Sequence, residues 1–247
     1  MRRSVRRRLC FPTARIARLP ISVKAGSAAR PAQPPFAGPE ARRLNGLSIV
    51  TPCSRPENLI TIWPTIPQGS QWLVVLDRPN LDDAPPALQA EPNIEFACTT
   101  GVGGWGNAQR NLGLSRATRD YVYFLDDDNI VHPALTSVLA EHQQSRKIIV
   151  VNQLLADGSL RFKARPPVQV NEIDTAQVLV PRELATRFTW KPHTPRADGF
   201  YFAALYETCR KSFVFLDVDA AYYNYLAPTR TGQALLPGAR RLDSRPK

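Results

Sequence analysis

Short apolar runs alternate with amphipathic stretches through the first two thirds of the chain. Runs of this kind, rich in β-branched and aromatic residues, are typical of strands buried on both faces of a sheet. The predicted strands are 47–52, 72–77, 94–98, 121–125 and 148–151. Spacing between them predicts helices at 57–63, 107–116 and 133–144. This alternation favours right-handed βαβ crossovers and therefore a parallel sheet in an α/β fold.

The pattern loosens after residue 151. A hairpin or meander is expected at 160–170, and further strands are expected at 177–180, 213–216 and 221–226. Helices are predicted at 181–188 and 199–210. The folded domain is expected to span residues 44–233, with a polar, basic tail at 234–247.

Most of the net charge of +11 lies at the N-terminus. Residues 1–43 contain 11 of the 32 basic residues but only one of the 21 acidic residues, Glu40. The remainder is almost neutral, which argues against nucleic-acid binding by the domain itself. The basic arm is predicted to be disordered; an organellar transit peptide and an arm that contacts a membrane surface are the alternatives.

The cysteines and the hydropathy pattern indicate a reducing compartment. None of Cys10, Cys53, Cys98 and Cys209 has the spacing of a metal site, so we interpret them as free thiols. No apolar run approaches the length of about 20 residues that spans a bilayer. No apolar segment typical of a signal peptide is present either. These features predict a cytoplasmic protein.

Three consecutive carboxylates, Asp126, Asp127 and Asp128, follow the strand predicted at 121–125. Adjacent carboxylates repel one another, so such a cluster requires a cation or strong hydrogen-bond donors. Ligands of open α/β sheets bind at the carboxyl ends of the strands. The sequence therefore predicts a hard-metal site there, and a solvated turn that caps the next helix is the alternative.

A G-x-G-x-x-G pattern occurs at Gly101, Gly103 and Gly106. It lies between a strand and a helix, as in dinucleotide-binding folds. However, it follows the third strand rather than the first, and Trp105 stands where a pyrophosphate would approach. We therefore interpret it as a glycine loop at the rim of the same pocket, able to close over a substrate.

Other polar residues are predicted near the same edge of the sheet. Asp77 ends the second strand and is either a turn residue or an acceptor for a nucleobase or ribose. Arg110 has the geometry to bind diphosphate in a bidentate manner, with Asn111 beside it. Asp198 is either the N-cap of a buried helix or a general base. His193 is a further candidate for binding metal or acceptor.

The strand 48–52, Asp77 after the second strand and the acidic triplet together resemble GT-A glycosyltransferases, closest to the family 2-like inverting enzymes. Two further motifs, Gln109-Arg110-Asn111 beside 123–129 and Thr229-Arg230-Thr231, also resemble animal β-1,3-glucuronyltransferases. The chain departs from those enzymes at Pro228, where they carry a histidine. Their base is also a glutamate in a different motif.

This resemblance implies a GT-A fold with a nucleotide-sugar-binding half at 44–152 and an acceptor half at 153–233. It implies a UDP-sugar donor and Mn²⁺ or Mg²⁺ bound by Asp128 and Asp126, with Asp126 also facing the ribose. Asp198 matches the catalytic base that deprotonates the acceptor hydroxyl, on a glycan, a lipid-linked sugar or a small molecule. The other implied donor-site residues are Pro52, Ser54, Arg55, Asp77, Arg110, Asn111, Asp127 and Arg230.

Two other functions are considered. A nucleotidyltransferase shares the sheet and the paired acids, but its glycine-rich loop after the first strand is replaced here by residues 53–56, which contain no glycine. A non-catalytic binding protein on the same scaffold is the second alternative, and the intact acidic triplet argues against it.

Overall fold

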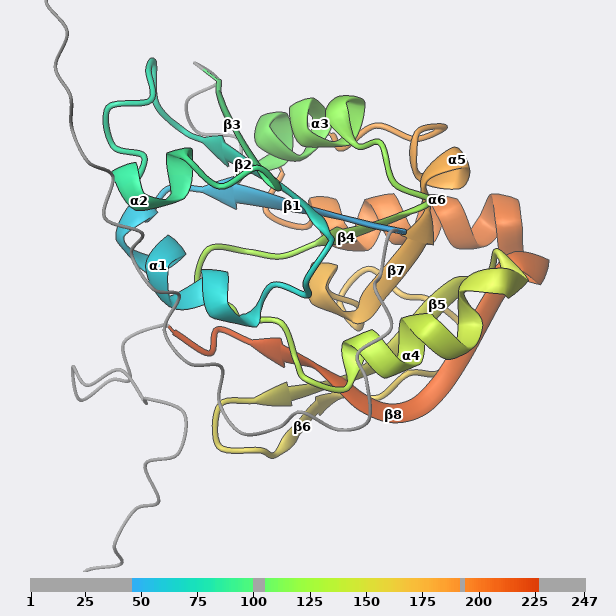
Figure 1. Cartoon of the computed structure of the whole chain (residues 1–247). Coiled ribbons are helices and arrows are strands. Elements are labelled where there is room, and N and C mark those ends of the chain that lie inside the picture. The colour runs from blue at the N-terminus through green and yellow to red at the C-terminus, as the bar shows by residue number, and fades with distance from the viewer. Residues whose placement is uncertain (1–45, 100–104, 192–193, 227–247) are drawn as a thin grey trace, which may run out of the picture. The chain divides into compact units, whose positions relative to one another are not determined.

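An eight-stranded sheet forms the centre of the computed structural model, which describes residues 46–99, 105–191 and 194–226 (Figure 1). The sheet order is β3-β2-β1-β4-β7-β5-β6, and β8 pairs with β5. Strands β1 to β4 are mutually parallel, whereas β7 is antiparallel to both of its neighbours. The strands are β1 (Leu47–Cys53), β2 (Gln71–Leu76), β3 (Ile94–Cys98), β4 (Tyr121–Phe124), β5 (Ile148–Leu155), β6 (Leu160–Phe162), β7 (Val178–Pro181) and β8 (Phe213–Tyr223).

Helices cover both faces of the sheet, which explains why the central strands are apolar throughout. One apolar cluster joins the sheet to α1 (Leu59–Ile62), α2 (Pro86–Gln89) and α4 (Leu135–His142). A second cluster, on the other face, joins it to α3 (Asn107–Arg116), α5 (Arg182–Ala185) and α6 (Ala197–Cys209). Short 3₁₀ helices occur at Pro56–Asn58, Trp63–Thr65, Gln143–Ser145, Thr175–Gln177 and Arg210–Ser212.

The α/β fold is confirmed, but several predicted elements were wrong in detail. The strands predicted at 213–216 and 221–226 form one strand, β8, because its polar centre continues to pair with β5 through an irregular register. The predicted helix 57–63 is broken into short pieces that include prolines. Only 160–162 of the expected hairpin or meander pairs as a strand. The strand β5 is not adjacent to β4, because β7 lies between them.

The sheet order reverses direction at β1, which has β2 on one side and β4 on the other. A crevice forms at such a switch point, outside the carboxyl ends of the strands. Helix α3 lies against this edge at very short range: a Cβ on Gly113 would lie 2.4 Å from Val50 Cγ1. The absence of a side chain at Gly113 lets the second half of α3 pack closely on the middle of β1. Gly106, just before α3, does the same at the end of β1, because a Cβ there would lie 2.9 Å from Pro52 Cβ.

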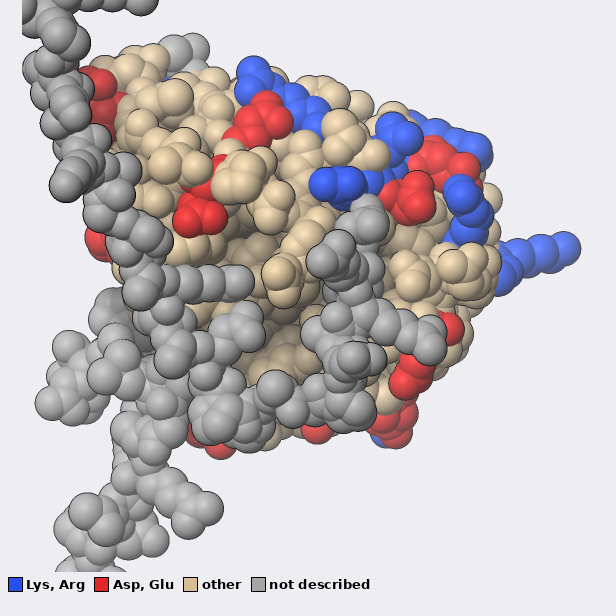
Figure 2. All heavy atoms as spheres, viewed as in Figure 1, with Lys and Arg blue, Asp and Glu red and all other residues tan. Residues whose placement is uncertain are grey.

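Acidic and basic side chains are interspersed on the face drawn in Figure 2, and no broad basic field is seen on its described residues. This agrees with the near-neutral composition of the chain after residue 43. None of the helices in the described ranges is both long and apolar enough for a membrane span.

Candidate active site

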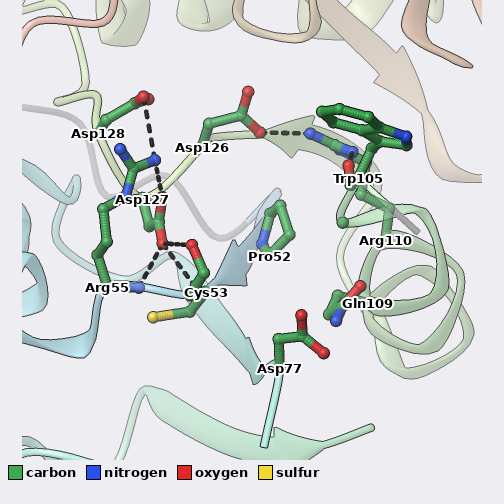
Figure 3. A pocket seen from close by; sticks show the side chains of 12 residues that line it. Pro52, Cys53, Arg55, Asp77, Trp105, Gln109, Arg110, Asp126, Asp127 and Asp128 are labelled. Carbon is green, nitrogen blue, oxygen red and sulfur yellow. Dashed lines mark hydrogen bonds and ion pairs between the residues drawn. The ribbon is translucent and has the colours of Figure 1, made fainter. Parts of the chain in front are cut away.

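A cavity of about 310 Å³ opens at the switch point, beyond the carboxyl ends of β1, β2 and β4 (Figure 3). It brings together three regions that the sequence analysis singled out: the loop after β1, the end of β2 and the acidic triplet after β4. The start of α3 completes the wall. The lining residues are Pro52, Cys53, Ser54, Arg55, Asp77, Trp105, Gly106, Gln109, Arg110, Asp126, Asp127 and Asp128.

Asp127 is held by the loop that follows β1. One carboxylate oxygen accepts hydrogen bonds from the Ser54 amide at 2.6 Å, the Ser54 hydroxyl at 3.0 Å and the Arg55 amide at 2.7 Å. The other oxygen accepts from Arg55 Nε at 2.9 Å and forms an ion pair with Arg55 Nη2. Both oxygens of this buried carboxylate are therefore occupied. The geometry makes Asp127 a residue that fixes the loop rather than one with free acceptors for a donor molecule.

Replacing Asp127 by Ala is expected to destabilise the fold by about 2–4 kcal/mol, because it leaves buried N–H donors and a partly buried guanidinium without their partner. Urea unfolding monitored by circular dichroism measures this change. Asp83→Ala is the matched control, because Asp83 forms only an exposed ion pair with Arg78 and should change stability by less than about 1 kcal/mol. Equal effects of the two substitutions would contradict the assignment of Asp127.

Asp128 combines one paired oxygen with one unpaired oxygen. Its Oδ2 lies 3.0 Å from Arg55 Nη2, whereas its buried Oδ1 has no hydrogen-bond partner among the described residues. Burial and then the neighbouring charge of Asp126 raise the pKa of Asp128 to about 6. An oriented carboxylate with one unsatisfied buried oxygen is suited to a cation.

Asp126 points toward α3, where Arg110 Nη2 lies 2.5 Å from Asp126 Oδ1. Arg110 is only 7% exposed, and its guanidinium lies over the ring of Trp190, 4.9 Å from the centroid. It also donates to the Trp105 carbonyl at 2.8 Å. Arg110 was predicted to bind diphosphate, and in the structure its guanidinium is the counter-ion of Asp126.

The described residues contain no group of three or more His, Cys, Asp or Glu side chains arranged to bind a metal. In the described part of the cavity, Asp128 and Asp126 are the carboxylates that we consider as ligands of a cation. This donor set fits Mg²⁺ or Mn²⁺ bound jointly by protein carboxylates and substrate phosphates.

Asp77 and Cys53 form the β1–β2 side of the cavity. The Asp77 carboxylate makes no hydrogen bond or ion pair within the described residues and is free to accept one from a ligand. Burial, followed by the charge of Asp127, raises the pKa of Cys53 to about 12. This thiol is therefore protonated at neutral pH and is not suited to nucleophilic catalysis.

Asp198 lies at the second position of α6, not at its N-cap, because the helix begins two residues earlier than the N-cap interpretation requires. Its Oδ1 accepts a hydrogen bond from the Gly199 amide at 2.8 Å. Burial raises its pKa to about 6; the charges of Asp174 and Asp126 act in the same direction, and Arg110 opposes them. Asp198 does not line the cavity, but its charge is coupled to two residues that do.

The position of α6 is fixed by close backbone packing. A Cβ on Gly199 would lie 2.0 Å from the Val170 carbonyl oxygen, so the first turn of α6 lies directly against residue 170. Only glycine permits this approach. The contact fixes the first turn of α6, which carries Asp198, against the backbone of residue 170.

Asn111 lies outside the cavity. Its side chain accepts a hydrogen bond from the Trp190 amide at 2.9 Å and donates to the Trp190 carbonyl at 3.0 Å. The structure thus places it as a link between α3 and the segment before α6. Arg230 and His193 lie outside the described residues, as do Gly101 and Gly103 of the glycine motif.

Two features of the site were missed by sequence reasoning. Gln109 lines the cavity, although in the sequence it was noted only as part of the Gln109-Arg110-Asn111 motif and was given no role. Thr175, whose hydroxyl lies 3.3 Å from Asp126 Oδ2, comes from a capped turn whose Asp174 forms an ion pair with Arg161. Thr175 could not be found from a local motif, because its partner Asp126 is 49 residues away in the sequence.

The segment that follows β8 is hydrogen-bonded to the acidic turn. The Leu226 amide donates to the Asp128 carbonyl at 2.7 Å, and the Tyr225 amide donates to Asn129 Oδ1 at 3.1 Å. Asn129 is itself almost fully buried. The backbone that carries Asp128 is therefore held from both the β1 loop and the C-terminal part of the domain.

Comparison with known proteins identifies the family of the chain. Residues 87–213, just over half of the chain, match the model of glycosyl transferase family 2. The chain belongs to this family. Its mixed α/β sheet has the GT-A fold. No curated protein sequence matches the chain.

Solved structures of TarS from S. aureus share this fold. The structure of TarS 1–349 matches with a TM-score of 0.54 and 13% identity. The complex of the same fragment with UDP gives 0.57 and 14%, and the complex with UDP-GlcNAc gives 0.52 and 12%. Each match covers 72% of the present chain but only 58–60% of the TarS fragment. Because the identities are only 12–14%, the likeness establishes the fold alone.

Proposed function

We propose that this protein is a metal-dependent, inverting glycosyltransferase that transfers a sugar from a UDP-sugar to an acceptor hydroxyl. The observation that carries the proposal is the arrangement of Asp77, Asp126 and Asp128 around one cavity at the switch point of a GT-A sheet. Family membership supports the reaction class. The UDP and UDP-GlcNAc complexes of TarS support the choice of donor.

The donor would extend across the cavity, with its nucleoside toward β2 and its diphosphate toward the acidic turn. Asp77 offers an acceptor to the nucleoside, and Asp126 offers one to the ribose. Asp128 and Asp126 would bind the divalent cation, as the unpaired Asp128 Oδ1 suggests. When bound, this cation would neutralise the charge that develops on the leaving diphosphate.

Transfer with inversion requires one base and one displacement. We assign the base to Asp198, because burial holds its pKa near 6, so that it is ionised yet still basic at neutral pH. Its carboxylate would take the proton of the acceptor hydroxyl as that oxygen forms a bond to the anomeric carbon. The bond between the anomeric carbon and the diphosphate oxygen breaks on the opposite side, and the electron pair leaves with the diphosphate.

A thermal-shift panel tests the donor site. The full-length protein is heated with UDP, GDP, dTDP or CMP, each in the presence of Mn²⁺ or of EDTA. A nucleotide present at 100 times its Kd should raise the unfolding free energy by about 2.7 kcal/mol. We expect UDP to stabilise the protein by several degrees with Mn²⁺, and to do so much less with EDTA.

The alternatives give different results. No shift with any nucleotide would contradict the proposed donor site. Metal-dependent binding of UDP without sugar release across a broad acceptor panel would favour the non-catalytic binding protein. Release of pyrophosphate from a nucleoside triphosphate would identify a nucleotidyltransferase instead.

A further inference from the structure

Gln109 has an unusual environment for a buried polar side chain. The residue is 1% exposed, and its Oε1 has no hydrogen-bond partner among the described residues. Nor does its Nε2 donate a hydrogen bond to any of them. Buried amides are almost always paired, since an unpaired one costs the free energy of its desolvation. An amide left unpaired in the wall of a cavity therefore indicates a polar ligand group that binds there.

Gln109 lies at the nucleoside end of the cavity. It belongs to the first turn of α3, which packs on β1 and β2, and it lines the cavity together with Asp77. In Figure 3 the Gln109 amide and the Asp77 carboxylate lie near one another, away from Asp126 and Asp128. The neighbouring residue Arg110 points the other way, toward Asp126. The first turn of α3 thus contributes Gln109 to the end of the cavity near Asp77 and Arg110 to the end near Asp126.

We propose that Gln109 recognises the base of the donor, with its amide paired to the N3–H edge of uracil. This assignment rests on the proposed function, and it adds the residue on α3 that recognises the base of the nucleotide. Oε1 accepts the N3–H hydrogen bond, and Nε2 donates to an adjacent carbonyl oxygen of the ring. A primary amide and the lactam edge of uracil are complementary, because each presents one donor beside one acceptor. The Asp77 carboxylate remains available for a ribose hydroxyl.

A thermodynamic cycle between residue and ligand tests this pairing. Wild type and Gln109→Met are titrated with UDP and with 3-methyl-UDP by isothermal calorimetry, in the presence of Mn²⁺. Methionine fills a similar volume and removes both polar atoms. In wild type we expect 3-methyl-UDP to bind about 10- to 100-fold more weakly than UDP, because a paired contact to a base edge is lost. In Gln109→Met we expect UDP to be weakened by a similar factor and the two ligands to differ by less than about threefold.

Two controls make the result specific. Gln89→Met makes the same substitution at an exposed glutamine on α2 and should leave both affinities unchanged. The ligand-free Gln109→Met protein should unfold at the same urea concentration as wild type or a higher one, because an unpaired buried amide is replaced by an apolar group. A lower midpoint would show that Gln109 is needed for the fold, and would overturn the claim that its amide is unpaired.

Other outcomes also overturn the proposal. If Gln109→Met binds UDP as wild type does, or loses UDP and 3-methyl-UDP equally, Gln109 does not contact the N3–H group. If the cycle shows coupling for Asp77→Asn and none for Gln109→Met, the N3–H group is bound by Asp77. If wild type prefers a nucleotide other than UDP, the uracil assignment fails while the donor site stands. If wild type binds no nucleotide, the proposed function fails as well.

Discussion

Asp198→Asn is expected to lower kcat for sugar transfer by about 10²- to 10⁴-fold while UDP affinity stays within about threefold of wild type. The amide keeps the shape of the carboxylate but cannot accept the proton of the acceptor hydroxyl. The residue does not line the cavity, so donor binding should not depend on it. Steady-state kinetics with a saturating donor, combined with calorimetric titration of UDP, separate the two effects.

The same residue predicts a pH dependence. Burial raises the pKa of Asp198 to about 6, and only the ionised form acts as a base. The value of kcat/KM should therefore fall as pH decreases below about 6 and level off above it. This rise with pH should be lost from the residual activity of Asp198→Asn. Asp128 titrates in the same range, and comparison of the two profiles assigns the ionisation.

Glu207→Gln is the control for this prediction, because Glu207 is an exposed acid on the same helix, α6. It should leave kcat, KM and the pH profile unchanged. If Asp198→Asn retained full activity, or if the Glu207 variant lost as much, another group would have to be the base.

Asp128→Asn is expected to abolish metal-dependent binding of UDP and to reduce transfer by at least about 100-fold, because it removes the principal proposed ligand of the cation. The same substitution should stabilise the ligand-free protein at pH 7 by about 1–3 kcal/mol. A folded-state pKa near 6, above the usual value of 3.8, means that folding opposes ionisation of this carboxyl. The amide avoids that cost and can still accept a hydrogen bond from Arg55.

The size of this stability effect changes predictably with pH, whereas its sign does not. Below about pH 4 the carboxyl is protonated in both the folded and the unfolded states, so the difference between variant and wild type should vanish. It should grow between pH 4 and 6 and be complete at pH 7. Urea unfolding at these three pH values, in EDTA, measures it. Asp120→Asn, at an exposed position immediately before β4, serves as the control. Destabilisation by Asp128→Asn at pH 7 would contradict the argument.

The sequence predicted the part of the fold in which each element depends on its own residues. Strands β1, β2 and β4 are buried on both faces, so each appears as a largely apolar run, and helix α3 was predicted with its observed limits. The acidic triplet could be placed at the cavity because parallel strands end at one edge. Prolines divide the helix predicted at 57–63 into short pieces. Polar residues in the centre of β8 made one strand look like two in the sequence.

The roles of individual site residues depend on partners that sequence spacing does not reveal. Three adjacent aspartates look equivalent in the sequence, yet Asp127 is bound to the β1 loop, Asp126 pairs with Arg110, and Asp128 keeps an unpaired oxygen. Likewise, Asn111 and Gln109 are two positions apart on one helix, but only Gln109 lines the cavity. These differences arise from tertiary contacts over many residues.

The insertion of β7 beside β4 has a consequence for how the protein must be made. β4 carries the acidic triplet, and its second edge is covered only when Val178–Pro181 pairs with it, long after β4 has left the ribosome. Until then a short, apolar strand edge is open to pairing with other chains. A fragment that ends near residue 152 is therefore unsuited to separate expression or to exchange between proteins as a module. Soluble production should require a chain that extends through at least β7.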